Sequence, residues 1–413
     1  MTSRVAITGL GVVAPLGNSI DELFAGLQAG KSGVRVLPAP CSGPQGPSIG
    51  ATVETPVCPR IPETRLRMLD RVSYLALVAA TQAVEDSGID FNQENRGRCG
   101  VSVGTGMGGA ATTDEGYHIL YAERSDRIKP FTVIAAMTNA AAAWIGLEYA
   151  LAGPNLTYST ACSSSAVSIG EAAEKIRTGR ADVMIAGGAE APLTPGVLRA
   201  WSAMRTLASV DKVDPSASCR PFSMTRSGLV LGEGAAFLVL ESWEHATQRG
   251  VKIHAALSGY GLTTDVAHIT RPTVIGQASA MRAALNAAGC SPNAVDYINA
   301  HGTATLQNDA VETAAIKEVF GSRAYQIPVS STKSMHGHLL GAAGALELVI
   351  CVGCLERGWI PPTMHLDQPD PACDLDYVPG AGRTRTSLRI ALSNSFAFGG
   401  TNAVLAVENV GAS

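Results

Sequence analysis

Short runs rich in β-branched residues alternate with stretches of helical hydrophobic period along almost the whole chain. The strand-like runs include "RVAITGLGVV", "CGVSVGTG", "ADVMIAGGAE" and "LRIALSNS". Helical periodicity lies over 71–87, 164–177, 276–289, 308–319 and 340–357. This alternation predicts an α/β protein with mixed or parallel sheets. No low-complexity linker divides the chain, and we expect the region 36–62, which is rich in Pro, Gly and Ser, to be a surface excursion.

Length and charge limit the classes of protein that fit. The chain has 413 residues, 46% of them hydrophobic, which is enough for a large core in one or two domains. Its formal net charge of −4 provides no global field for binding nucleic acid. The N-terminus lacks the residue order of a signal peptide, and apolar stretches such as "LVLGEGAAFLVL" are too short to span a membrane. We therefore expect a cytoplasmic protein without a nucleic-acid or membrane partner.

The cysteines favour a reducing compartment. There are nine, an odd number at irregular spacing, which argues against a disulfide framework. The one CxxC pair, Cys351 and Cys354, lies in an apolar helical run with no second pair nearby. Because a structural zinc site needs four ligands, we interpret this pair as core packing.

A weak internal similarity between two parts of the sequence predicts two similar halves. The run "LTYST" leads through Cys162 into a helix, and "IPVSSTKS" leads through His338 into the helix that contains "GAAGALELV". Each half also ends with a pair of strands around glycines. We expect a pseudo-duplicated core, with an N-terminal half over 1–250 and a C-terminal half over 251–413.

Two glycine-rich segments resemble nucleotide-binding motifs. Residues 8–14, "TGLGVVA", have the GxGxxA pattern, but Pro15 would interrupt the helix that must receive a pyrophosphate. Residues 104–109, "GTGMGG", lack the Lys-Ser/Thr step of a phosphate-binding loop. For the second segment, close backbone packing beside a site is the favoured interpretation.

Cys162 differs from the other cysteines in its surroundings. It stands among small polar residues, directly before a helix whose charges begin only at Glu171. The positive end of a helix dipole lowers the pKa of a nearby thiol and favours a nucleophilic thiolate. A buried, inert thiol is the alternative that this position alone leaves open.

Two distant segments strengthen the case for a nucleophile. The segment "NAHGTATLQND" puts His301 at a strand end, followed by Thr303 and Thr305 in a turn, and "STKSMHGHLLG" puts Lys333 and His338 at another strand-to-helix turn. Ligands bind at the strand ends of α/β sheets, so we expect a cysteine and two histidines to converge there.

These motifs resemble a known family. "TACSSS", "HGTATLQND", "KSMHGHLLGAAGALE", "CRPFSMTRSGLVLGEGAA" and "NSFAFGGTN" are similar, in order, to the β-ketoacyl-acyl carrier protein synthases of the synthase II type and their type II polyketide relatives, from Val5 to about Asn409. The resemblance implies a thiolase fold, five layers αβαβα made of two similar halves, and an intimate dimer. It also implies a catalytic triad of Cys162, His301 and His338.

Further roles follow from the same resemblance. Lys333 matches a family lysine that pairs with a glutamate at Glu347, and the pair is expected to organise the site, with Thr303 and Thr305 also in supporting roles. Phe398 matches a gating phenylalanine, and the backbone N–H groups of Cys162 and Phe398 would hold the oxyanion. His336 stands where the family does not keep a histidine and is interpreted as incidental.

The implied reaction is a decarboxylative condensation. Cys162 would take an acyl chain from a phosphopantetheine thioester, and malonyl-carrier protein would then lose carbon dioxide to give an enolate that His301 and His338 stabilise. Neutral imidazoles suit this task, because positive charge beside the thiol would change both pKa values. No metal and no cofactor beyond the carrier's phosphopantetheine is implied.

The chain departs from housekeeping synthase II enzymes at several positions. It reads "CSSS", "HGTATLQND" and "SFAFGGTN", with Ala397 in place of a glycine, which should stiffen the loop of Phe398. Trp201 stands where smaller aromatic residues often line the acyl tunnel, to which Met107 is also assigned. These changes favour a specialised polyketide, polyene or Nod-factor type of chain; the alternative is housekeeping fatty-acid elongation.

Other classes were compared position by position. A thiolase would need a second cysteine in a C-terminal glycine-rich loop, and "FAFGGTN" has none. A synthase III or chalcone-type enzyme would have asparagine in place of His338, and a non-catalytic chain-length factor would lack Cys162. The interpretation in which Cys162 and both histidines merely pack requires five motifs to match by chance.

The expected partners are acyl carrier protein and a second subunit. That subunit is either an identical chain or a cysteine-less chain-length-factor-like paralogue. Carrier proteins are acidic, so a basic docking patch is expected, and the candidate residues are Arg60, Arg65, Arg67 and Arg71.

Overall fold

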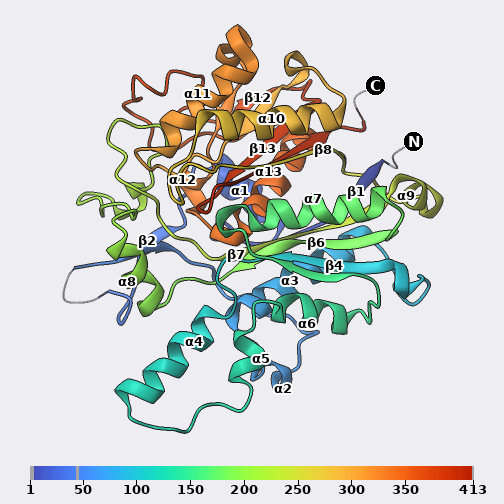
Figure 1. The fold of residues 1–413 in the computed structure, drawn as a ribbon, viewed down its shortest axis with the longest axis vertical. Helices are drawn as coiled ribbons and strands as arrows, with labels where there is room; N and C mark the ends of the chain where they lie inside the picture. The colour runs from blue at the N-terminus through green and yellow to red at the C-terminus, as the bar shows by residue number, and fades with distance from the viewer. Residues whose placement is uncertain (1–3, 43–45, 412–413) are drawn as a thin grey trace.

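Two sets of five strands with the same topology form the centre of the molecule. The computed structural model describes residues 4–42 and 46–411 (Figure 1). The strands follow the order β10-β9-β13-β14-β8-β1-β7-β6-β4-β5. One set runs outward from β1 to β5 and the other outward from β8 to β10. In each set, the first two strand pairings are antiparallel and the last two are parallel. This repeat confirms the two pseudo-duplicated halves.

The N-terminal half contains the following main elements: β1 (Val5–Val13), α1 (Ile20–Gln28), β2 (Val34–Val36), β3 (Ile49–Ala51), α2 (Glu63–Leu66), α3 (Arg71–Ser87), β4 (Cys99–Gly104), α4 (Ala110–Tyr117), α5 (Thr132–Ala136), α6 (Ala140–Glu148), β5 (Asn155–Tyr158), α7 (Ser164–Arg177), β6 (Val183–Glu190), α8 (Pro195–Ala203), β7 (Gly234–Ser242) and α9 (Trp243–Arg249). The helices expected over 71–87 and 164–177 match α3 and α7.

The C-terminal half contains β8 (Ala255–Thr264), α10 (Val274–Ala288), β9 (Tyr297–Asn299), α11 (Asn308–Phe320), β10 (Val329–Ser330), α12 (Lys333–His336), α13 (Ala343–Arg357), β11 (Trp359–Ile360), β12 (Arg383–Thr384), β13 (Ile390–Phe396) and β14 (Thr401–Glu408). The helix expected over 340–357 begins as one 3-10 turn before α13. Residue 250 follows α9, shortly before β8.

Five layers follow one another in Figure 1. Helices α3 and α6 cover the outer face of one strand set, α10 and α11 cover the outer face of the other, and α7 and α13 lie between the two sets. The central helices approach closely, because Gly344 of α13 faces Ala166 of α7, and a Cβ on Gly344 would lie only 2.9 Å from the Ala166 Cβ. The site is therefore built around the ends of this central pair.

Glycine pairs let the outer helices lie directly on the sheets. A Cβ on Gly9 or Gly11 of β1 would lie 2.0 Å from a carbonyl oxygen of α3. In the other half, Gly259 and Gly261 of β8 have the same relation to α10, at 2.2 and 2.1 Å. The GxGxxA pattern at 8–14 therefore serves helix–sheet packing.

The region 36–62 is more than the surface excursion expected from its composition. Strands β2 and β3 pair with each other, and Ala51 donates its N–H to the Leu231 carbonyl at 2.8 Å. Leu37, Ile49 and Ala51 are buried, and Leu37 packs in the same apolar cluster as Cys162. The expectation was wrong for these residues, because their apolar side chains, scattered among Pro, Gly and Ser, are buried against other segments. Residues 43–45 lie outside the described residues.

The CxxC pair lies in the core, as expected. Cys351 and Cys354 are fully buried in α13, among the apolar residues between the strand sets. All nine cysteines carry free thiols. Among the described residues, no helix combines the length and the apolar character that crossing a membrane requires.

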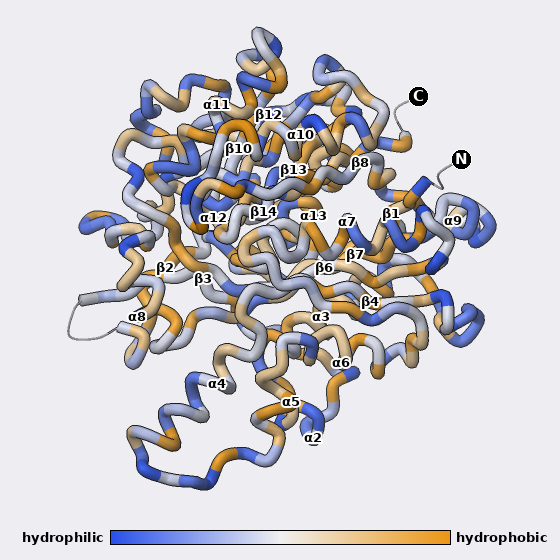
Figure 2. Tube along the Cα trace, in the orientation of Figure 1, coloured by the Kyte–Doolittle hydropathy of each residue, from blue (hydrophilic) through white to orange (hydrophobic). Residues whose placement is uncertain are grey.

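An arm formed by α4, the π-helical turn His118–Ala122 and α5 extends away from the layers (Figure 1). Its trace passes through both hydrophobic and hydrophilic segments in Figure 2. Tyr117, Tyr121 and Val133 are exposed on it, and Leu156 is exposed on β5, the last strand of the sheet order. The molecule therefore exposes apolar side chains both on the arm and on the edge strand β5.

A buried histidine ties the outer helix of one half to the central helix of the other. His254 contacts Asp86 of α3 through Nε2 at 2.9 Å and Glu356 of α13 through Nδ1 at 2.8 Å. Burial alone would lower the pKa of His254, but the two carboxylates outweigh it and raise the pKa to about 9.

Stability should therefore fall as the pH rises. A raised histidine pKa stabilises the folded chain fully below the unfolded pKa of about 6.5, and this contribution, up to about 3 kcal/mol, is lost as the pH passes through 9. Thermal unfolding between pH 6 and pH 10 should show this loss in the wild type and in H118Q, a change at an exposed histidine, but not in H254Q. Equal pH slopes in H254Q and the wild type would contradict the role of His254.

Candidate active site

Cys162 stands at the turn between the edge strand β5 and the central helix α7. The turn is a 3-10 helix, Ala161–Ser163, and Ala161 has a φ of +50°. Ser164 fixes it from both sides, because its hydroxyl accepts the Thr160 N–H at 2.9 Å and donates to the Ala161 carbonyl at 2.6 Å. Cys162 itself is buried, with 6% of its surface exposed. A sharp, hydrogen-bonded turn therefore holds the sulfur in one place.

His301 follows β9 and is held by a carboxylate that the sequence analysis missed. Glu312, fully buried on α11, accepts the backbone N–H groups of His301 and Gly302, each at 2.8 Å. Asn394 of β13 donates to the same carboxylate at 3.1 Å. The position of the His301 imidazole therefore depends on the Glu312 carboxylate, which holds the backbone of its turn.

His338 lies beyond α12, in the position of the second half that corresponds to Cys162 in the first. The backbone N–H of His338 donates to the Val230 carbonyl at 2.7 Å. Before it, Lys333 is fully buried and pairs with Glu347 of α13, as expected. His336 is also buried, but its ring bonds to Thr332 and to the Gly337 carbonyl and does not line the cavity, which agrees with an incidental role in the chemistry.

The three reactive side chains meet at one cavity. The Cys162 sulfur and a nitrogen of each of His301 and His338 all lie within 4.8 Å of one another, and the two rings are 5.3 Å apart in an edge-to-face arrangement. The cavity has a volume of about 460 Å³, and its lining also includes Thr303, Thr305 and Phe398. One sulfur and two nitrogen ligands at this spacing could also hold a metal ion such as zinc.

Burial keeps both histidines neutral. It lowers the pKa of His301 and of His338 well below the usual range, and the positive charge of Lys333 lowers both further. Within the described part of the chain, Nδ1 of His301 and both ring nitrogens of His338 have no hydrogen-bond partner. Neutral imidazoles with free nitrogens are therefore available to a bound substrate.

The pKa of Cys162 is shifted opposite to the direction expected from its helix position. Burial raises the pKa of the thiol to about 12, and the Glu190 carboxylate acts in the same direction. Lys333 and the backbone N–H groups of Phe398 and Cys162 favour the thiolate but do not outweigh burial. The expectation considered the helix end and not the depth of the pocket, so the resting sulfur is a thiol whose proton must move when it reacts.

Phe398 forms the cavity wall together with a tight glycine turn. Its ring stacks on Trp201 of α8, with centroids 6.0 Å apart. Gly399 and Gly400 have φ values of +86° and +84°, whereas Ala397 is not among the residues with positive φ, so an alanine fits there without strain. Trp201 packs against the apolar cluster of Cys162 and does not line the cavity, and neither does Met107, so their assignment to an acyl tunnel stays a prediction.

The four arginines of the predicted docking patch do not line this cavity. Arg60 pairs with Glu85, and Arg65 pairs with Glu148. Arg71 is half-buried and binds both carboxylate oxygens of Glu233 at 2.7 Å, which makes it a structural residue. Arg67 has no ion pair among those found in the described residues. The patch stays a prediction, while the exposed Arg205 and Arg271, which the sequence analysis did not select, line the cavity.

Glu190 is a second buried carboxylate near the site that the sequence analysis missed. At the end of β6 its buried carboxylate accepts the N–H groups of Gly106 at 2.6 Å, Met107 at 3.1 Å and Gly341 at 3.0 Å. Burial raises its pKa to about 7. The glycine-rich segment 104–109 is therefore packed beside the site, as expected, and the signal that could have revealed the anchor is a glutamate that ends an otherwise apolar strand.

Known proteins with this arrangement identify the family. The model of the β-ketoacyl synthase N-terminal domain matches residues 2–246, and that of the C-terminal domain matches residues 254–367. The chain belongs to the β-ketoacyl synthase family. This synthase has the thiolase fold and is a carbon–carbon bond-forming acyltransferase.

Relatives of the synthase include proteins with different names. It is 46% identical to "Nodulation protein E" of Rhizobium meliloti strain 1021, with 99% of this chain and 100% of the relative covered. It is 42% identical to "3-oxoacyl-[acyl-carrier-protein] synthase 2" of Coxiella burnetii, with 98% and 99% covered. A solved structure, "The ishigamide ketosynthase/chain length factor", matches with a TM-score of 0.91 and 33% identity over 99% of this chain and 100% of that chain.

Glu312 supports a test of how the synthase positions His301. Glu312→Gln removes the charge and presents an amide NH₂ to one of the two backbone N–H groups, so we expect kcat for condensation to fall by about tenfold or more. Alkylation of Cys162 by iodoacetamide should keep its wild-type rate. The control is E318Q, on the same helix but exposed, where Glu318 pairs with Arg282. An E312Q enzyme with full condensing activity would contradict the positioning role.

Proposed function

We propose that the synthase extends a carrier-bound acyl chain by decarboxylative condensation in a specialised pathway, with Cys162, His301 and His338 as the catalytic residues. One observation carries the assignment of roles: a buried thiol and two neutral imidazoles with free nitrogens meet at a single cavity. The metal-site alternative is disfavoured by the family, whose reaction requires a free sulfur nucleophile.

In the first half-reaction, the Cys162 sulfur attacks the carbonyl carbon of an acyl thioester. The thiol proton moves to a neighbouring imidazole, the carbon–sulfur bond to the carrier breaks, and the carrier leaves as a free thiol after taking up that proton. Negative charge on the thioester oxygen is stabilised by the N–H groups of Cys162 and Phe398, the same groups that favour a charged sulfur here.

In the second half-reaction, a malonyl thioester loses carbon dioxide, and its electron pair becomes an enolate. Ring N–H groups of His301 and His338 donate to the enolate oxygen, which they can do as neutral imidazoles. The enolate carbon then attacks the acyl group, the bond to Cys162 breaks, and the sulfur takes up a proton. Lys333 and Glu347 lie behind the histidines as a buried ion pair, and this position supports an organising role rather than proton transfer.

The carrier's phosphopantetheine arm is the substrate handle that fits the cavity. Thr303 and Thr305 line its wall and offer hydroxyl groups to amides of the arm, while Arg205 and Arg271 offer positive charge to an acidic carrier. Acyl groups arrive as thioesters, so the proposed reaction needs no cofactor of its own. We place the enzyme in the cytoplasm, where nine free thiols suit the reducing conditions.

A dimer is part of this proposal. The open edge of β5 and the apolar residues of the α4–α5 arm support pairing with a second subunit. That subunit is an identical chain or a chain-length-factor-like paralogue, as in the solved ketosynthase/chain length factor structure. The likeness to a nodulation protein and the departures at Trp201 and Ala397 support a specialised product, with housekeeping elongation as the alternative.

One prediction of this mechanism concerns the acyl-enzyme. Incubation with acyl-carrier protein should add one acyl group to Cys162, seen by mass spectrometry, and Cys162→Ala should abolish the adduct and the condensation. The control Cys290→Ala should retain both. A series of acyl lengths should label Cys162 selectively in a specialised synthase and broadly in a housekeeping one. Labelling at another residue would refute the mechanism.

Another prediction of this mechanism separates the two half-reactions. H301A and H338A should each keep part of the self-acylation, because the nucleophile and the oxyanion N–H groups remain. Both should lose release of carbon dioxide from malonyl-carrier protein by at least about a hundredfold, because the enolate loses a donor. Release of ¹⁴CO₂ measures this step, and its retention in both variants would contradict the proposed role.

A further inference from the structure

The turn over residues 302–307, here called the threonine turn, connects His301 to α11 along the cavity wall. Thr303 and Thr305 line the cavity, and their hydroxyl oxygens lie 3.0 Å apart. Asn308 and Asp309 are the first two residues of α11 and do not cap it. The Thr305 hydroxyl accepts the Asn308 N–H at 3.3 Å, and Asp309 is buried, where it accepts the Phe222 N–H at 2.8 Å. The turn therefore presents to the substrate a pair of coupled hydroxyls.

The backbone of this turn needs support from outside. Gly302 and Ala304 have φ values of +34° and +64°, and for alanine the left-handed region is unfavourable. Helix α11 begins at Asn308, and its N-cap residue, Gln307, makes no side-chain hydrogen bond to the first turn. Gly228 provides one contact, because its N–H donates to the Ala304 carbonyl at 3.0 Å.

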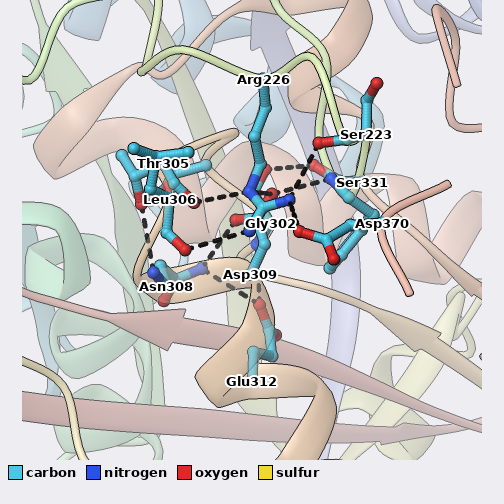
Figure 3. A network of polar contacts seen from close by, with 12 residues as sticks. Ser223, Arg226, Gly302, Thr305, Leu306, Asn308, Asp309, Glu312, Ser331 and Asp370 are labelled. Carbon is cyan, nitrogen blue, oxygen red and sulfur yellow. Dashed lines mark hydrogen bonds and ion pairs between the residues drawn. The ribbon is translucent and has the colours of Figure 1, made fainter. Parts of the chain in front are cut away.

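Ser331 donates its hydroxyl to the Gly302 carbonyl at 2.6 Å, and Arg226 supports the other end of the turn (Figure 3). Its side chain is 3% exposed. Nε donates to the Thr305 carbonyl at 3.0 Å, and one terminal nitrogen donates to the Leu306 carbonyl at 3.0 Å. The other terminal nitrogen donates to the Ser223 carbonyl at 2.8 Å and to Asp370 at 2.5 Å. One guanidinium thus binds two consecutive carbonyls of the threonine turn and anchors them to a separate loop.

The charge of Arg226 is balanced within the same network. Asp370 forms an ion pair with it, and the buried Asp309 carboxylate lies 3.9 Å from Nε. Because a buried charge is costly unless it is paired and hydrogen-bonded, this environment is specific for a group with five fixed donors. A lysine could keep the charge but could not reach two carbonyls and a carboxylate in one plane.

We propose that Arg226 is a positioning residue that holds the threonine turn in the shape that binds the phosphopantetheine arm of the substrate. It acts through Thr303 and Thr305 and does not itself line the cavity. This inference rests on the proposed function, because the arm is the ligand that the two hydroxyls would meet. It assigns a role to an arginine of the "CRPFSMTRSG" segment that the mechanism above leaves unused.

The test compares two donors of the same acyl group. An acyl pantetheine carries the amides of the arm, whereas the matching acyl ethyl thioester has none, and both can acylate Cys162. For R226K, the KM for acyl pantetheine should rise about tenfold or more with kcat changed less than about twofold, and acylation by the ethyl thioester should be unchanged. Intact-mass spectrometry follows both reactions.

Two further variants define the result. D370N weakens the ion pair that holds Arg226 on the side away from the threonine turn. It should therefore raise the KM for acyl pantetheine by a smaller factor than R226K does. If R226K does not fold, D370N decides the question. R220K is the matched control, because Arg220 lies in the same segment but bonds to the Ala217 carbonyl and Asp211. It should behave as wild type with both donors.

Each other outcome overturns the inference. Equal losses on both donors in R226K mean that the arginine only maintains the fold, and no loss on either donor means that the turn does not depend on it. A wild type that uses both donors equally well shows that the turn does not bind the arm, while Cys162 remains the nucleophile. A wild type acylated by neither donor, nor by acyl-carrier protein, refutes the proposed function as well.

Discussion

The close contact between α7 and α13 is the constraint on which the rest of the site depends. Gly344 faces Ala166 with no room for a Cβ, and the Ala345 N–H donates to the Ser165 hydroxyl at 2.9 Å. Each of these helices is preceded by a turn that carries a reactive residue, Cys162 in one half and His338 in the other. Small residues at the crossing therefore bring the turns that carry Cys162 and His338 close together.

Burial determines the chemical state of these groups. In a desolvated pocket the imidazoles are neutral and the sulfur holds its proton, while Lys333 and Glu347 pair with each other. In the proposed mechanism, charge develops on the reacting atoms only when a thioester enters, next to N–H groups that are already in place. A site of this kind favours transfer of an acyl group to and from sulfur over hydrolysis of the thioester by water.

The sequence predicts the reactive residues better than their supports. Cys162, His301 and His338 could be selected because each follows a strand, and the pairing of Lys333 with Glu347 followed from the family resemblance. The sequence could not single out Glu312, Glu190 and Arg226, because it does not distinguish a buried charged residue from an exposed one. The role of a buried charged residue depends on which backbone groups pack against it. The direction of the Cys162 pKa was wrong for the same reason: helix position is visible in the sequence, whereas pocket depth is not.

The place of Cys162 immediately after β5 has a consequence for two subunits. Strand β5 is the last in the sheet order, and only a few residues separate its end from the sulfur. If a second chain pairs with this edge, the two copies of Cys162 lie within a few residues of the shared interface. Each proposed active site would then border the partner subunit, so the interface would limit how far the turn that carries Cys162 can move.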